Sequence, residues 1–486
     1  MSKFETAAGT LHRLREHVWE LPKTGDMNVP GRVFASKALL EEISEDKTLE
    51  QLANSTHLPG ITKHAICMPD GHQGYGFPVG GVGAMDANSG CISPGAVGYD
   101  INCGVRMMRT NLRYDDVVGK EPELVDALFE TIPSGLGGGG IVESDVSTVD
   151  DILENGVKWA LENGWAVEED LTHCEDEGFR PEADASAISE RAKNRGKSQI
   201  GSLGSGNHFL EVQRVTDIYR EAVAESFGLA DDQIVVLIHC GSRGLGHQIC
   251  TDYLRKIEQT HSSLLQSLPD KELAAAPAGS ELAEQYYHAM GGAINFAWVN
   301  RQLIMHQTRQ AFASVFETDW RSLEMELLYD VAHNIAKKET HEVAGEDREL
   351  YVHRKGATRA FPAGRPELPP VYREVGQPVI IPGSMGAGSY VLRGGERSLE
   401  LSFGSTAHGA GRLMSRTQAK KEYWGEDVKD QLEADNQIYV RAQSGATVAE
   451  EAPGVYKNVD EVVRVSEALG IGDSVARTYP VCNIKG

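Results

Sequence analysis

Gly95 to Arg106 reads GAVGYDINCGVR and places a carboxylate and a thiol three residues apart in a glycine-rich turn. Asp100 offers a hard oxygen and Cys103 a soft sulfur, which a divalent ion of borderline character can use together with imidazole nitrogens. Histidines that could complete such a site stand in or directly after apolar runs, at His208, His239 and His333. Each alone is more typical of a hydrogen-bonded core residue, but together they predict a metal site, because burying unpaired polar rings is costly.

A further histidine, His408, lies in LSFGSTAHGAGR, where small neighbours leave its ring open to a bulky reactant. By itself it is more typical of a surface turn. The segment from Pro382 to Gly394 carries glycines and serines that could present N–H and hydroxyl groups to a phosphate. Arg354, Lys355 and Arg359 stand close together upstream. Although Gly-Ser turns are common, these elements together indicate a phosphate-handling centre.

Charge is distributed unevenly along the chain. The formal net charge is -24, from 47 Lys and Arg against 71 Asp and Glu, and this should repel nucleic acid. Residues 351–421, however, hold 11 bases and 4 acids, so a basic face could still bind phosphates within about a Debye length, roughly 8–10 Å. Residues 143–190 hold 15 acids and 2 bases and predict a mobile acidic surface insert.

With 486 residues and 41% hydrophobic content, the chain can bury a sizeable core, and we expect one domain over residues 1–486. Apolar runs stay well below the roughly 18–20 residues of a membrane span, and the opening residues lack the apolar core of a signal peptide. Seven cysteines without close-spaced pairs argue against a disulfide framework and favour a reducing compartment. These features predict a cytoplasmic protein.

Helical and strand-like patterns are interleaved, which predicts an α+β fold with a site assembled from distant strand and loop segments. Gln233 to His239 is strand-like and delivers a candidate ligand at its carboxyl end, where sheet-based sites tend to lie. The glycine run of residues 135–140 lacks a following Gly-Lys-Ser/Thr, so it is no phosphate-binding P-loop. Helical spacing predicts helices over residues 36–53, 149–165, 252–268 and 282–316.

Taken in order, the motifs resemble the RtcB family of tRNA-splicing RNA ligases over nearly the whole chain. They are MPDGHQGYGFPVGG, GAVGYDINCGVR, GSLGSGNHFLE, HCGSRGLGH, AHN, VHRKGATRA, PGSMG, STAHGAGR and KG. The resemblance implies a distinct α+β fold and an enzyme that uses GTP and manganese. It also implies RNA as the substrate, with a 3'-phosphate or 2',3'-cyclic phosphate end joined to a 5'-hydroxyl end, and archease as a candidate activating partner.

Carried over motif by motif, the resemblance implies that Asp100, Cys103, His208, His239 and His333 hold two manganese ions, with the Cys103 thiolate shared. It makes His408 the histidine that receives GMP. The nucleotide site would include Asn207, Phe209, Glu211, Ser384, Tyr456 and Lys485. Phosphate contacts would come from Arg243, Lys355 and Arg412. The alternative for each of these residues is a surface salt bridge.

Several alternatives stay open from the sequence. Asp70 and His72 either orient a 5'-hydroxyl or metal-bound water, or stabilise a tight turn. A two-metal phosphoesterase acting on RNA ends would need the metal ligands but neither His408 nor a guanine pocket. An RNA-binding protein with a structural metal would have a closed coordination sphere. Residues 474–484 mix apolar side chains as a buried strand does, which predicts that Lys485 is anchored.

Overall fold

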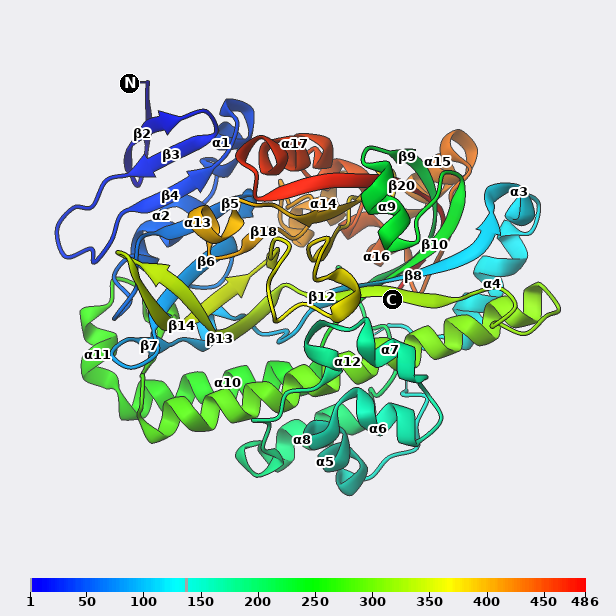
Figure 1. Cartoon of the computed structure of the whole chain (residues 1–486), viewed down its shortest axis with the longest axis horizontal. Helices are drawn as coiled ribbons and strands as arrows, with labels where there is room; N and C mark the ends of the chain where they lie inside the picture. The colour runs from blue at the N-terminus through cyan, green and yellow to red at the C-terminus, as the bar shows by residue number, and fades with distance from the viewer. Residues whose placement is uncertain (1, 136–138) are drawn as a thin grey trace.

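The computed structural model describes residues 2–135 and 139–486, so part of the predicted 135–140 glycine run lies outside the described residues. Two large sheets organise the described chain (Figure 1). The first runs in the spatial order β1 (Lys3–Thr6), β2 (Gly9–Arg15), β3 (Val18–Leu21), β4 (Gly31–Phe34), β5 (Ala65–His72), β6 (Val79–Asp86), β14 (Glu346–Lys355) and β13 (Asn334–Val343). Its neighbours pair antiparallel except β4 with β5, where helices α1 (Lys37–Ile43) and α2 (Thr48–Ser55) supply the crossover that a parallel pair needs.

The second sheet contains one predicted metal ligand, His239 in β10, and its strands adjoin the segments that carry the other four. Its spatial order is β12 (Glu326–Ala332), β8 (Gly104–Arg113), β10 (Gln233–Cys240), β9 (Phe209–Ile218), β20 (Gly472–Lys485), β17 (Ser389–Gly394) and β16 (Pro378–Ile381), with β19 (Tyr439–Ala442) parallel to β20. Strand β10 reads QIVVLIHC and is almost entirely buried. Such a continuous apolar run is typical of a strand covered on both faces.

Helices cover the sheets and connect their strands. Two of them, α10 (Arg243–Thr260) and α12 (Glu281–Val315), run below the sheets in the view of Figure 1. The other helices are α3 (Tyr114–Val117), α4 (Glu121–Thr131), α5 (Val146–Asn155), α6 (Val157–Glu162), α7 (Glu168–Thr172), α8 (Glu190–Lys197), α9 (Glu221–Phe227), α11 (Ser262–Ser267), α13 (Ser398–Ser402), α14 (Arg416–Glu422), α15 (Gly425–Asn436), α16 (Gly445–Glu450) and α17 (Val459–Leu469). There are also two short strand pairs, β7 (Cys91–Ile92) with β11 (Ala276–Pro277) and β15 (Ala357–Arg359) with β18 (Ser405–Ala407). The described 3-10 helices are Pro94–Ala96, Glu175–Gly178, Ala185–Ala187, Lys271–Leu273, Pro370–Tyr372 and Pro453–Val455.

The predicted α+β class is confirmed, and so are its clearest elements. The helix expected over 282–316 is α12, and the strand expected over 233–239 is β10. The helix expected over 149–165 is wrong in one respect, because the chain breaks between α5 and α6 at Gly156. Gly156 has a φ of +56°, and an added Cβ would lie 2.4 Å from the carbonyl oxygen of Gly178. Hydrophobic periodicity does not reveal such a close backbone approach.

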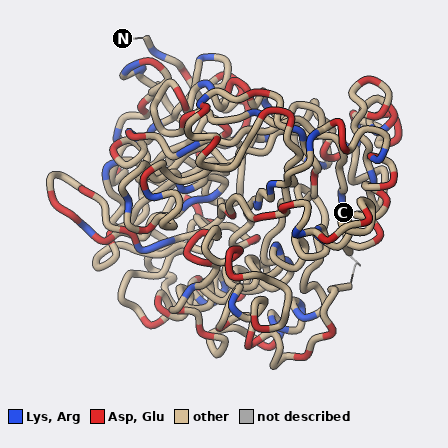
Figure 2. The backbone as a smooth tube through the Cα atoms, turned by 45° about the vertical axis from the view of Figure 1, so that its right-hand side comes forward, with Lys and Arg blue, Asp and Glu red and all other residues tan. Residues whose placement is uncertain are grey.

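The acidic stretch of residues 143–190 is partly buried, so its prediction as a surface insert is wrong for its central residues. Asp170 receives two hydrogen bonds from Arg309, at 2.8 and 2.7 Å, and both side chains are buried. Glu175 accepts a bond of 2.6 Å from Lys337 in β13. A local excess of acids cannot reveal these cations, because they stand more than 100 residues away. Figure 2 shows acidic residues spread along the whole tube with basic ones among them.

All seven cysteines carry free thiols and are buried, in line with the expected lack of a disulfide framework. Among the described helices, none combines the length and apolar character needed to cross a bilayer.

Candidate active site

Four adjacent strands of the second sheet bring the five predicted metal ligands to one end. In the register, Gly104 of β8 pairs with both Cys240 of β10 and Ala332 of β12, and Phe209 of β9 pairs with His239. Four ligands lie at or directly beside these paired positions, and Asp100 lies four residues before Gly104. Residues separated by more than 200 positions therefore meet because their strands are neighbours in space.

The donor atoms form two overlapping groups that share Cys103. One group is Asp100, Cys103 and His208, and the other is Cys103, His239 and His333; the donor atoms of each group lie within 4.8 Å of one another. The Cys103 Sγ lies 3.5 Å from Nε2 of His208 and 3.2 Å from Nε2 of His239. A thiolate shared by two cations fits this arrangement, and the donor set of oxygen, sulfur and nitrogen suits a borderline divalent ion.

The histidine rings are oriented with Nε2 toward the shared thiol. Nδ1 of His208 lies 3.0 Å from the carbonyl oxygen of Leu203, whereas its Nε2 lies 2.8 Å from Oδ2 of Asp100. Nε2 of His239 lies 3.3 Å from Nε2 of His333. Two imidazole nitrogens that face each other at this distance in a buried pocket are well accommodated when cations occupy the space between the donors.

Electrostatics keep two of the three histidines neutral, whereas the Cys103 thiol and the Asp100 carboxylate raise the pKa of His208 well above its ordinary value. Burial lowers the pKa of His239 and of His333 well below the ordinary value, so both rings are neutral near pH 7. Burial raises the pKa of the Cys103 thiol to about 11, and Asp100 adds to this. A bound divalent cation would stabilise the thiolate and lower that pKa again.

Arg301, at the middle of α12, holds the backbone behind the cluster. Its buried guanidinium donates to the carbonyl oxygens of Asn102, at 2.8 Å, and Cys240, at 2.7 Å, each next to a metal-ligand candidate. Asp330 balances its charge at 2.8 Å. Sequence analysis missed this contact, since an arginine in a long helix predicts a surface residue.

His408 follows β18 and lies beside the cluster, with its ring 4.9 Å from that of His333. Asp70 of β5 is fully buried, and its Oδ2 lies 2.6 Å from Nδ1 of His408. The same oxygen accepts the backbone N–H of His408 at 3.0 Å and of Gly409 at 3.3 Å. An Nδ1–H that donates to this carboxylate leaves the lone pair on Nε2, which is the form a nucleophile needs.

The structure places Asp70, whose role the sequence left open, in contact with His408. Gly411 permits this approach, because at its φ of +75° an added Cβ would lie 2.2 Å from the carbonyl oxygen of Asp70. His72 also lines the cavity, its ring centroid 6.5 Å from that of His408, and burial lowers its pKa to about 4. The motif around Asp70 and His72 indicated chemistry, but the 338-residue separation concealed the partner.

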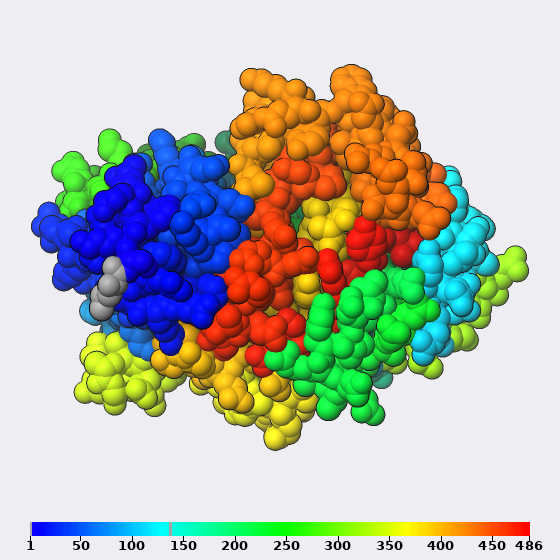
Figure 3. Space-filling model, turned by 90° about the horizontal axis from the view of Figure 1, so that it is seen from above, coloured from blue at the N-terminus to red at the C-terminus, as the bar shows by residue number. Residues whose placement is uncertain are grey.

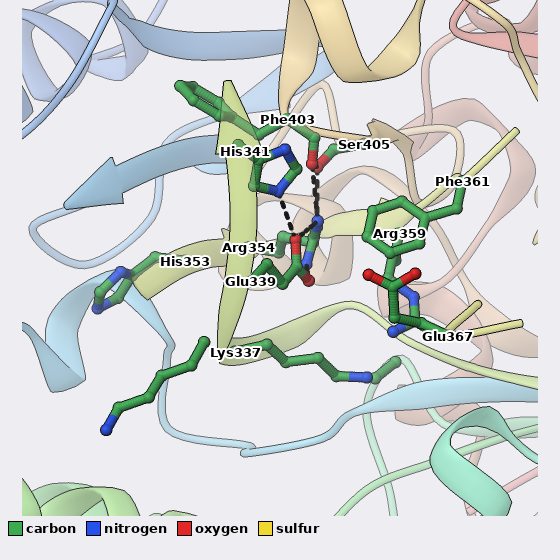
Figure 4. Close-up of polar contacts among 12 residues, drawn as sticks. Lys337, Glu339, His341, His353, Arg354, Arg359, Phe361, Glu367, Phe403 and Ser405 are labelled. Carbon is green, nitrogen blue, oxygen red and sulfur yellow. Dashed lines mark hydrogen bonds and ion pairs between the residues drawn. The ribbon is translucent and has the colours of Figure 1, made fainter. Parts of the chain in front are cut away.

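A buried ion pair anchors the strand that delivers His408. Arg354 of β14 makes two bonds to Glu339, at 2.6 and 2.9 Å, and His341 contacts the same carboxylate at 2.9 Å (Figure 4). Arg354 also donates to Oγ of Ser405 at 2.8 Å and to the carbonyl oxygen of Phe403 at 2.9 Å. The prediction that Arg354 belongs to a phosphate-handling centre is therefore wrong, because its buried guanidinium donates its hydrogen bonds to protein groups.

A cavity of about 830 Å³ opens over His239, His333 and His408. The surface is hollowed beside the orange segment that carries α14 to α16, with the red end of the chain at its margin (Figure 3). Most of the predicted nucleotide residues line this cavity: Asn207, Phe209, Glu211, Ser384, Tyr456, Lys485, Lys355 and Arg412. Arg243 is not among the described lining residues; its Nη1 lies 3.4 Å from Nδ1 of His208.

At one end of the cavity a carboxylate and an aromatic ring lie close together. Glu211 accepts a bond of 2.6 Å from Gln213 and a second from Asn483, and burial raises its pKa to about 7 against the opposing effect of Lys485. The Lys485 ammonium lies 5.0 Å from the Phe209 ring centroid. It belongs to β20, which pairs with β9, so the predicted anchoring of this lysine is confirmed.

Two of the three predicted phosphate cations, Lys355 and Arg412, are already engaged by protein groups. Lys355 donates to the carbonyl oxygens of Tyr75 and Gly95, and Arg412 to Glu451 at 2.9 Å and to the Glu450 carbonyl at 2.8 Å. Arg416 lines the cavity with a side chain 47% exposed, and sequence analysis missed it. Its position four residues after Arg412, in the same basic window, was the available signal.

Two overlapping groups of possible metal ligands, a histidine hydrogen-bonded to a buried aspartate and a cavity of about 830 Å³ are the features expected of a metal-dependent group-transfer enzyme. The sequence model of the family described as tRNA-splicing ligase RtcB matches residues 51–486. The chain is 54% identical over 477 residues to the tRNA-splicing ligase RtcB of Thermococcus kodakarensis, covering 98% of this chain and 99% of that protein. It is 51% identical over 478 residues to that of Aeropyrum pernix and 49% over 479 residues to that of Methanococcus maripaludis, with the same coverage. The chain belongs to the RtcB family.

Proposed function

We propose that this chain is an RNA ligase of tRNA splicing or RNA repair that joins a 3'-phosphate or 2',3'-cyclic phosphate end to a 5'-hydroxyl end, with GTP and manganese. The observation that carries the proposal is the Asp70 and His408 pair, because it leaves Nε2 of His408 as a nucleophile beside the metal-ligand cluster. The family membership supports ligase chemistry in general. The choice of manganese rests on the family resemblance, because thiolate and imidazole ligands bind zinc more tightly than manganese.

In the proposed first step, Nε2 of His408 attacks the α-phosphorus of GTP. An N–P bond forms, the bond to the bridging oxygen breaks, and pyrophosphate leaves. Asp70 holds the ring through Nδ1–H and stabilises the positive charge that develops on it. Bound at the cluster, two manganese ions would act as Lewis acids toward the phosphate oxygens.

In the following steps an oxygen of the RNA 3'-phosphate attacks the phosphorus of His408-bound GMP and frees the histidine. The 5'-hydroxyl then attacks the activated 3'-phosphorus, loses its proton and releases GMP. A 2',3'-cyclic end must first be hydrolysed to the 3'-phosphate. Activation by GMP turns a poor leaving group into a good one, which is the reason for consuming GTP.

The guanine end is assigned to Glu211, Phe209 and Lys485. The Glu211 carboxylate can accept the imino and amino protons of guanine, a donor pair that adenine lacks. Phe209 offers an aromatic face, and it also contacts the His239 ring edge-on at 5.3 Å. The base would therefore bind next to the metal-ligand cluster.

The test is incubation of the purified chain with labelled GTP and manganese, followed by a denaturing gel and then by RNA with matched ends. We expect a covalent label that is lost in acid, retained in alkali, and chased by RNA into a joined product. A protein inert to GTP would support a structural metal site, and end trimming without label would support the phosphoesterase. Repeating the reaction with archease tests that predicted partner.

Asp70→Asn should slow labelling of His408 by roughly two to four orders of magnitude, since an amide can stabilise the wrong tautomer and carries no charge. The initial rate of label incorporation at saturating GTP measures this. Asp46→Asn is a matched control, because Asp46 lines the same cavity but accepts from the backbone N–H of Gln73 at 2.9 Å. Equal labelling rates in Asp70→Asn and wild type would reject the orienting role.

GTP affinity should depend on pH through Glu211, whose pKa burial raises to about 7. Below pH 7 the carboxyl holds a proton that it must release before it can accept from guanine. Affinity should therefore fall about tenfold per pH unit below 7 and level off above it. Glu211→Gln should bind GTP weakly and should lack the part of the pH dependence that comes from Glu211. The GTP phosphates also ionise near pH 6, and their contribution is removed by subtracting the pH profile of Glu211→Gln from that of the wild type. Identical pH profiles for the two proteins would contradict the assignment.

A further inference from the structure

Three aromatic rings form a short row at the edge of the cavity. Tyr75 and Tyr99 meet edge-to-face with their centroids 5.3 Å apart, and Tyr99 lies nearly parallel to His247, at 5.8 Å and 28°. The two tyrosines are half-buried and the His247 side chain is exposed. Tyr99 lines the cavity and directly precedes Asp100 of the metal-ligand cluster. The nucleotide mechanism leaves these rings without a role.

The backbone that carries the row is held firmly. Lys355 crosses beneath it and donates to the carbonyl oxygens of Tyr75 and Gly95, so one buried ammonium ties the two loops together. The Glu272 carboxylate accepts the N–H of Gly76 at 2.7 Å, which fixes the loop after Tyr75. His247 lies on helix α10. Rings held in place before binding lose little conformational entropy when a ligand stacks on them.

A basic helix lies next to the row. Helix α8 has the sequence ERAKNRGK, with four bases and one acid, but Lys193 is buried and pairs with Asp150 at 2.8 Å. Arg191 and Arg195 are exposed. Arg195 donates to Oε1 of Gln248 at 3.1 Å, so its guanidinium lies beside the residue that follows His247. Arg191 and Arg195 are therefore the cations that α8 offers to a phosphate approaching this side of the cavity.

We propose that Tyr99 and His247 form a stacking platform for an unpaired nucleobase of the RNA end, and that α8 contacts the adjoining phosphates. The proposal rests on the proposed ligase function and adds an RNA subsite to it. Aromatic faces beside arginines are the combination that binds single-stranded nucleic acid irrespective of base identity. The guanine of GTP is assigned elsewhere, since its pocket adjoins His239 through Phe209, whereas Tyr99 adjoins Asp100.

The experiment uses a short RNA that carries 2-aminopurine as the last base, either at a 3'-phosphate end or at a 5'-hydroxyl end. Stacking should quench the fluorescence in wild type and in Tyr99→Phe, which keeps the ring. Tyr99→Leu should remove the quenching and weaken RNA binding roughly five- to hundredfold. The RNA arm whose quenching depends on Tyr99 identifies which end stacks.

Labelling of His408 by GTP in the absence of RNA separates the two proposals. Wild type that takes no label overturns the proposed function itself. If the wild-type protein takes the label, and Tyr99→Leu binds RNA and quenches 2-aminopurine fluorescence as the wild type does, only the stacking platform is overturned. If Tyr99→Leu also fails to take the label, the platform is tested with His247→Ala, using the same fluorescence and affinity measurements. This substitution should leave the fold intact, because the His247 side chain is exposed and alanine is favourable in a helix.

Arg195→Ala supplies a further readout. Loss of one phosphate contact should lower the slope of log affinity against log salt by about 0.7 for single-stranded RNA. An unchanged slope together with unchanged affinity would remove α8 from the proposed subsite. If this surface binds a protein partner instead, 2-aminopurine fluorescence should be the same in wild type and in Tyr99→Leu. That result would reject the RNA proposal.

Discussion

His408→Ala should abolish covalent transfer of GMP to the chain while leaving the fold and the bound metal unchanged. The substitution removes the Nε2 lone pair, and His408 is not one of the clustered metal-ligand candidates. The buried Asp70 carboxylate keeps the backbone N–H groups of residues 408 and 409 as hydrogen-bond donors. Labelled GTP with a denaturing gel measures the covalent step, and metal analysis with thermal unfolding measures the rest.

His72→Ala is the matched control for this experiment, because His72 is the other cavity-lining histidine outside the metal-ligand cluster, 6.5 Å from His408 between ring centroids. We expect His72→Ala to retain a label on His408. A label that persists in His408→Ala and disappears in His72→Ala would move the nucleophile to His72. A label stable in acid would exclude a phosphohistidine-type bond altogether.

Cys103→Ser should lower bound manganese and abolish both labelling and RNA joining. A neutral hydroxyl replaces an anionic sulfur that belongs to both donor groups, so both ions lose a ligand at once. The measured quantities are metal ions per chain after purification and the rate of each step. Because the thiol is buried and the exchange is nearly isosteric, the global fold should persist.

Cys240→Ser is the corresponding control. Cys240 is an equally buried thiol next to His239, but its Sγ lies 3.3 Å from the carbonyl oxygen of Leu203 and outside both donor groups. It should keep its metal and most of its activity. Full metal content and full activity in Cys103→Ser would reject the shared-ligand role.

The structure brings together the five residues that the sequence singled out as metal ligands, because metal chemistry restricts the residue types. Cysteine, histidine and aspartate at the ends of apolar runs are costly to bury without a cation, so the side chains themselves pointed to the site. Asp70 could not be assigned in the same way. Its role depends on one long-range contact to His408, and an aspartate in a glycine-rich turn is equally consistent with local hydrogen bonding.

The basic residues were the least predictable part of the site. Arg354, Lys355 and Arg412 stand in one basic window, yet the structure commits each to a carboxylate or to backbone carbonyls. Local sequence reports how many charges a segment carries but not which of them are neutralised by partners brought in from other elements. The same reason explains the burial of Asp170 and Glu175.

The position of β20 bears on how the protein folds. This strand is the last of the second sheet in sequence, yet it lies in the interior of the sheet between β9 and β17. Until residues 472–485 have been synthesised, β9 and β17 each present an unpaired edge of backbone N–H and carbonyl groups. Such edges are templates for pairing with other chains. We expect this protein to reach its native state slowly, because closing the sheet requires contacts of long sequence separation, and to be most prone to aggregation just before β20 inserts.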